Sequence, residues 1–179
     1  MQTRTRLFLA LCASVAAASA MAQAQAPTAA PGAPPPAPPR ARGPALALAV
    51  EAAQTAIAVC LANGYKTTAT VVDSAGVPVA MLAADGAAER TQMIGLTKTS
   101  ATIKYKVPSG EIADRVKTDA ALDAEVKADA KIGTARRGAL PIKVGGEIIG
   151  AMSVSGAPGG DKDEVCTQAG LDKIASRLK

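Results

Sequence analysis

The basic side chains of Lys98, Arg136 and Arg137 are the residues of this 179-residue chain best suited to bind a ligand. A guanidinium donates two parallel hydrogen bonds to a carboxylate, and an ammonium group adds a compact positive charge. If the three side chains converge, they form a small cationic pocket for a carboxylate. The alternative is a solvent-exposed arginine pair, with Lys98 bonded to Asp85 just before the same helix.

Catalysis has fewer candidates than binding. Asp85 and Lys98 could act as acid and base, but no third group completes such a site. The chain has no histidine, which excludes Ser-His and Cys-His nucleophilic catalysis and a histidine metal site. The sequence therefore assigns no catalytic and no metal-binding residue.

A glycine-rich segment, 156–160, precedes the last predicted helix and could cradle a phosphate. Asp161, Asp163 and Glu164 follow it directly and crowd the position that an anion needs. We therefore favour a structural interpretation, in which the glycines form the turn and the acids stabilise the positive end of the helix. Asp161 and Glu164 have the spacing of a capping box.

The strand predicted over 147–155 organises the rest of the domain. Apolar and small residues occupy both of its faces, which is typical of a central strand. Gly145-Gly146 joins it to a strand over 139–144, and 73–76 joins strands over 67–72 and 77–82, with Asp73 bonding its own turn. With a weak strand over 132–136, we expect an α/β domain of the α+β type: an antiparallel sheet of about five strands with helices packed on it.

Helices are predicted over 44–62, 88–105, 109–118, 119–131 and from Asp161 onward. In the first, an apolar stripe recurs at helical spacing: Leu46, Val50, Ala53, Ile57 and Leu61. In the second, a different set lies along one side: Met93, Leu96, Thr97, Ala101 and Lys104.

The N-terminal residues divide into two segments before the domain, 45–179. Residues 1–22 have a basic start, an apolar run and a small-residue cleavage site, which predicts a signal peptide and a periplasmic or secreted protein. A membrane anchor is the alternative, although the apolar run is short for a span. We expect no membrane span after signal removal. Residues 23–44 are rich in Pro and Ala and predict a disordered linker.

The charge and cysteine content narrow the partners. Residues 45–179 hold 16 basic and 15 acidic residues, so the high isoelectric point comes from the N-terminal arginines. With no Trp and little aromatic surface, we expect no nucleic-acid partner. Cys60 and Cys166 form either a disulfide, which export permits, or two separate buried thiols.

Several short motifs resemble the GlcG/HbpS family. They are Asp85-Gly86-Ala87, Lys98, Gly138-Ala139-Leu140-Pro141, Val154-Ser155-Gly156 and Asp163-Glu164, and together they extend over 45–179. The resemblance implies a profilin-like sandwich that assembles into homo-oligomers, and some exported members bind haem. Thr99 and Ala139 depart from the family's usual residues.

We therefore expect an exported small-ligand-binding protein whose ligand is haem or a small carboxylated metabolite. The residues expected nearest the ligand are Asp85, Lys98, Arg137 and Gly138. Two alternatives stay open: a small enzyme acting on a hydroxy acid or related metabolite, and a purely structural homo-oligomer. Axial ligands of haem iron would come from Cys, Met or Tyr, although core packing explains each of these residues better: Cys60, Cys166, Met81, Met93, Met152, Tyr65 and Tyr105.

Overall fold

The computed structural model describes residues 41–179. The predicted signal peptide and nearly all of the predicted linker lie outside the described residues. The elements in chain order are α1 (Leu46–Ala62), β1 (Thr68–Asp73), β2 (Pro78–Ala83), α2 (Arg90–Tyr105), α3 (Ser109–Arg115), α4 (Ala120–Ala128), β3 (Ala139–Val144), β4 (Glu147–Ser155) and α5 (Gly160–Ile174), followed by a 3-10 turn (Ala175–Arg177). None of the helices within 41–179 is long and apolar enough to cross a bilayer.

The sheet is antiparallel and has four strands in the order β2-β1-β4-β3. β4 pairs with β1 on one side and β3 on the other, and it is buried over most of its length, which confirms the predicted central strand. The fifth strand, expected over 132–136, is wrong. Ile132 and Gly133 donate their backbone N–H groups to Asp129 in a turn, and Ile132 packs into a small core beside α2, α3 and α4 instead of joining the sheet.

Both predicted hairpin turns are confirmed. The Oδ1 atom of Asp73 accepts hydrogen bonds from the backbone N–H groups of Ala75 and Val77, each at 2.9 Å. Gly145 and Gly146 have φ angles of 55° and 85°, a left-handed pair that glycine adopts without strain. These two turns fix the antiparallel pairing of β1 with β2 and of β3 with β4, the two outer pairs of the sheet.

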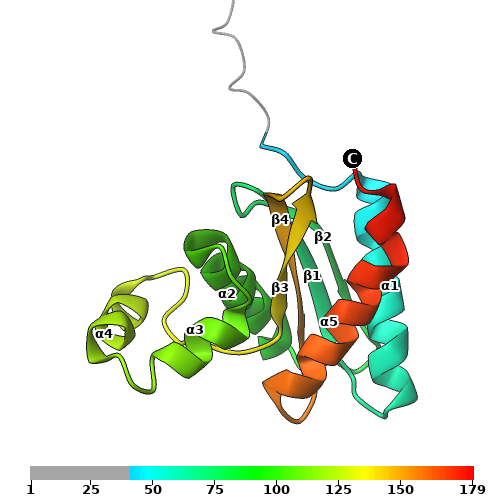
Figure 1. The fold of residues 1–179 in the computed structure, drawn as a ribbon. Helices are drawn as coiled ribbons and strands as arrows, with labels where there is room; N and C mark the ends of the chain where they lie inside the picture. The colour runs from blue at the N-terminus through cyan, green and yellow to red at the C-terminus, as the bar shows by residue number, and fades with distance from the viewer. Residues whose placement is uncertain (1–40) are drawn as a thin grey trace, which may run out of the picture. The chain divides into compact units, whose positions relative to one another are not determined.

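Helices α1 and α5 lie together on one face of the sheet, and α2 covers the other face (Figure 1). A disulfide joins Cys60 in α1 to Cys166 in α5. The two helices approach so closely that a Cβ atom on Gly170 would lie 2.5 Å from the carbonyl oxygen of Ala52. The predicted apolar stripe of α1 is therefore wrong at its ends: Leu46 and Leu61 are exposed, while alanines occupy the contact.

The contact between α2 and the sheet is polar. The hydroxyls of Thr68 and Thr91 lie 2.7 Å apart, and Ser153 donates a hydrogen bond of 2.9 Å to the carbonyl of Gly95. Met93, predicted on the same side as Ala101, is 65% exposed. The helix turns its glycine and hydroxyl residues toward the sheet, and this orientation carries Lys98 inward as well.

Candidate anion-binding site

Lys98 lies in the middle of α2, and its side chain is only 3% exposed. Its Nζ atom donates hydrogen bonds to the carbonyl oxygen of Val154 at 2.8 Å and to Oδ2 of Asp163 at 2.6 Å. Asp163 belongs to the first turn of α5, and its other oxygen accepts a hydrogen bond of 2.9 Å from the N–H of Ala157. The pair thus connects α2, the end of β4 and the start of α5.

Gly138 makes room for the lysine. Its φ angle is 125°, and a Cβ atom there would lie 2.7 Å from Nζ of Lys98 and 2.9 Å from Cβ of Asp163. A side chain at this position would therefore displace the ion pair and strain the backbone. The carbonyl of Gly138 also accepts a hydrogen bond from Thr167, which holds this glycine against α5.

Burial dominates the electrostatics of the pair. It lowers the pKa of Lys98 below the usual lysine value, with the positive charge of Arg136 acting in the same direction and Asp163 opposing it. Burial also raises the pKa of Asp163, against the opposing effect of Lys98. The two shifts bring the pKa values of Lys98 and Asp163 closer together, so transfer of a proton from Lys98 to Asp163 costs less here than between the same groups in water.

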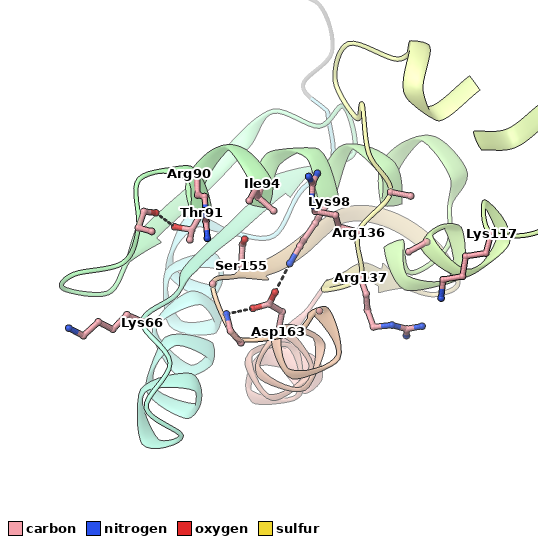
Figure 2. Close-up of a pocket in the computed structure, with 17 residues that line it drawn as sticks. Lys66, Arg90, Thr91, Ile94, Lys98, Lys117, Arg136, Arg137, Ser155 and Asp163 are labelled. Carbon is pink, nitrogen blue, oxygen red and sulfur yellow. Dashed lines mark hydrogen bonds and ion pairs between the residues drawn. The ribbon is translucent and has the colours of Figure 1, made fainter. Parts of the chain in front are cut away.

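A cavity of about 460 Å³ opens beside this pair. Six basic side chains and one acidic side chain line it: Lys66, Arg90, Lys98, Lys117, Arg136, Arg137 and Asp163. Figure 2 shows Lys66 on one side of the Lys98–Asp163 pair and Arg137 with Lys117 on the other. The glycines of the loop before α5 form part of the wall, so side chains do not block the start of that helix.

The basic residues around the cavity differ in how far their charge is compensated. Arg137 bonds to Asp114 and to Glu164, and Lys117 also bonds to Asp114. Within residues 41–179, Lys66, Arg90 and Arg136 form no ion pair with any acid. These three leave an excess of positive charge at the mouth of the cavity.

Comparison with known proteins identifies the family of this chain. Residues 45–172 match the family described as "Haem degrading protein HbpS-like". The chain belongs to the HbpS-like family. No curated protein matches the sequence.

Solved structures share the HbpS-like fold over most of their length. A double mutant of HbpS from Streptomyces reticuli is 26% identical, with a TM-score of 0.69 over 84% of this chain and 98% of that one. Protein ORFY of Klebsiella pneumoniae is 23% identical, with a TM-score of 0.70 over 80% and 97%. A PduOC:heme complex is 18% identical, with a TM-score of 0.67 over 75% and 96%.

The structure brings together three of the four residues that the sequence singled out in this HbpS-like domain. Lys98 and Arg137 line the cavity, and Gly138 packs against Lys98. Asp85 is exposed in the turn after β2 and does not line the cavity. The partner of Lys98 is Asp163, so the alternative that paired Lys98 with Asp85 is wrong.

Sequence reasoning missed Asp163 as a site residue, and it missed Lys66 and Arg90. The capping box predicted at Asp161 is also wrong, because Gly159 is the N-cap of α5 and no side chain caps it. Only Asp163 turns inward, toward Lys98, while Asp161 is exposed. Nothing in the spacing of Lys66 or Arg90 marks them as cavity residues.

The candidate iron ligands are not in the cavity wall of this HbpS-like chain. Cys60 and Cys166 form a disulfide, so neither thiol is free to bind iron. This resolves the open choice between a disulfide and two separate thiols. No Met, Tyr or Cys lines the cavity. Within residues 41–179 no cluster of three acidic, Cys or His residues could hold a metal ion.

Proposed function

We propose that this protein binds a small anionic molecule through its carboxylate groups, in the cavity beside Lys98. The observation that carries the proposal is the lining: six basic side chains around about 460 Å³, three of them without an ion pair within 41–179. Arginine and lysine side chains in a concave, partly dry site are the usual receptors for carboxylates.

Haem is the ligand that the relatives favour. The matching family is described as haem degrading, and PduOC was solved with heme. The cavity fits the two propionates, because Arg90 and Arg136 are available for them. It does not fit the iron, since no imidazole, thiol, thioether or phenol lines it. We therefore propose that haem, if bound here, is held by its propionates, and we assign no role to its iron.

Two titrations of the full chain test the proposal. Lactate, followed by amide NMR, should give saturable shifts around Gly156 and Gly160, and hemin should give a saturable Soret change. Arg136→Glu should weaken both, whereas Lys143→Glu should weaken neither, because Lys143 is exposed and lies outside this cavity. The two variants change the net charge equally, so only the position of the charge differs.

The outcomes separate the two ligands. A flat hemin titration with saturable lactate binding rejects haem and leaves the carboxylate site in place. Flat titrations with both, or equal losses in Arg136→Glu and Lys143→Glu, reject the proposed site.

We propose further that the mature protein works outside the cytoplasm and as a homo-oligomer. The predicted signal peptide supports export, and the disulfide between Cys60 and Cys166 supports it as well, because such bonds persist in oxidising compartments. The family resemblance supports self-assembly. The mass of the natively expressed chain checks cleavage after Ala22, and light scattering checks the oligomer.

A further inference from the structure

Lys98 is the one basic side chain within 41–179 that is buried. As an ammonium group it has three N–H bonds, and the described residues supply two acceptors, Val154 and Asp163. As a neutral amine it gives both hydrogens to these acceptors and keeps a lone pair. Lys98 also lines the cavity, so a ligand held there lies next to a lysine with one position on Nζ not taken by Val154 or Asp163.

The surroundings of Lys98 are those of a nucleophilic lysine. Such lysines are activated by desolvation or by a second cation nearby, and Lys98 has both. Burial and the charge of Arg136 lower its pKa, and burial raises the pKa of Asp163, the group that can receive its proton. Gly138 keeps the space next to Nζ free of any side chain.

We propose that Lys98 forms an imine with a 2-oxo carboxylate held in the cavity. The inference rests on the proposed carboxylate binding and adds a substrate class to it. Arg136 and Arg90 line the same cavity as Lys98, so either of them is a candidate to hold the carboxylate while the adjacent carbonyl carbon meets Nζ. A hydroxy acid has the same anchor but no electrophilic carbon, and a simple aldehyde has the carbon but no anchor.

The step balances within the site. Asp163 takes one proton from the ammonium group of Lys98, and the amine lone pair then attacks the carbonyl carbon. The carbonyl oxygen is protonated to a carbinolamine as nitrogen gives up a second proton. Loss of that oxygen as water, with a proton returned by Asp163, leaves the C=N bond. No oxidant or reductant takes part, and hydrolysis regenerates lysine and the 2-oxo acid.

Reductive trapping tests the proposal. The full chain is incubated with pyruvate and sodium cyanoborohydride, and its intact mass is measured. We expect one adduct per chain, with the mass of pyruvate less one water plus two hydrogens, and peptide mapping should place it on Lys98. Lys66 and Lys117 also line the cavity and serve as internal controls in the same digest.

Two further measurements keep the test decisive. Lactate should compete with adduct formation, and Lys98→Met should abolish it. If Lys98→Met does not fold because Asp163 is left buried alone, Lys98→Met/Asp163→Asn replaces it, and the mapping on the unaltered chain needs no variant.

The results distinguish this inference from the proposed function. If lactate binds in the cavity but pyruvate gives no adduct on Lys98, the imine is refuted and carboxylate binding stands. Labelling spread over Lys66, Lys117 and other exposed lysines also refutes it, because it shows surface reactivity alone. If neither lactate nor pyruvate binds, the proposed function itself fails.

Discussion

Asp163→Asn tests the buried ion pair most directly. The amide keeps the shape of the side chain and can still accept the N–H of Ala157, but it removes the negative charge opposite Lys98. Removing one partner of a buried pair costs about 3–5 kcal/mol, because the other charge stays desolvated and unpaired. We expect a loss of this size in the free energy of unfolding at pH 7.

The unpaired Lys98 of this variant sets an upper limit on the loss in the free energy of unfolding, and the limit depends on pH. Lys98 can fold as a neutral amine, at a cost fixed by the distance between the pH and the ordinary lysine pKa of 10.5. Each unit is worth about 1.4 kcal/mol, so the limit is about 5 kcal/mol at pH 7 and about 2 kcal/mol at pH 9. Since the unfolded chain then binds more protons than the native variant, the stability of Asp163→Asn rises with pH in this window.

Urea unfolding of the oxidised protein, followed by circular dichroism at both pH values, measures these losses. Asp161→Asn is the matched control: it lies in the same helical turn but is exposed, and it should cost no more than about 1 kcal/mol. Lys98→Met/Asp163→Asn should recover most of the stability. A loss below about 1 kcal/mol for Asp163→Asn at pH 7, or an equal loss at pH 9, would contradict the assignment of a charged buried pair.

Three other predictions follow from single features. Gly138→Ala should cost about 1–3 kcal/mol and weaken lactate binding, because its Cβ would meet Lys98 at a φ angle of 125°; Gly64→Ala, also at positive φ but in open space, should leave binding unchanged. Cys60→Ala/Cys166→Ala should lower the free energy of unfolding by about 4–5 kcal/mol, since the bond closes a loop with a sequence separation of 106; unchanged urea midpoints would contradict this. Arg136→Glu should weaken lactate binding at least tenfold at low salt and less at high salt, and a salt-independent effect would argue against a charge contact.

The strands of this domain were predictable because each is bounded by turn residues whose backbone needs are specific. Gly145-Gly146 can form a tight left-handed turn, and the residues of β4 are small or apolar on both faces, as an interior strand requires. The predicted ranges of β3 and β4 match the structure at both ends. The strand expected over 132–136 was wrong because an apolar residue such as Ile132 packs equally well into a small core between helices. Gly133, at a positive φ angle, turns the chain away from the sheet.

The buried faces of the helices were harder to predict. Counting Leu and Met as core residues assumes that the largest apolar side chains are buried, yet α1 meets α5 through alanines and α2 meets the sheet through hydroxyls. In both contacts, the distance between the helix and the element it packs against decides which residues of the helix are buried. That distance is set by tertiary neighbours such as Gly170, whose missing side chain lets α5 approach the carbonyl of Ala52 in α1.

The site was half predictable for a related reason. Lys98 and Arg137 stand out as basic side chains and Gly138 as part of a family motif, whereas Asp163, although it belongs to a family motif too, is already explained as an acid at the start of a helix. Asp161 and Asp163 differ by roughly 200° around the helix axis, so only one of them can turn inward. Which one does so depends on where Lys98 enters from α2, a contact across 65 residues of sequence that no local rule reaches.

The anion site proposed above is compatible with a nearly neutral domain, because the charges of the domain are unevenly distributed. Residues 45–179 hold 16 basic and 15 acidic residues, but six of the basic residues and one of the acidic residues line a single cavity. Because a concave, low-dielectric wall focuses the field of the charges around it, this local excess acts on an approaching carboxylate far more than the net charge does. The high isoelectric point of the whole chain is therefore incidental to binding. Asp114 and Glu164 compensate Arg137 on one side of the Lys98–Asp163 pair, whereas Arg136 is left without an ion pair within 41–179, so the uncompensated charge that the proposed site offers an anion is that of Arg136 rather than Arg137.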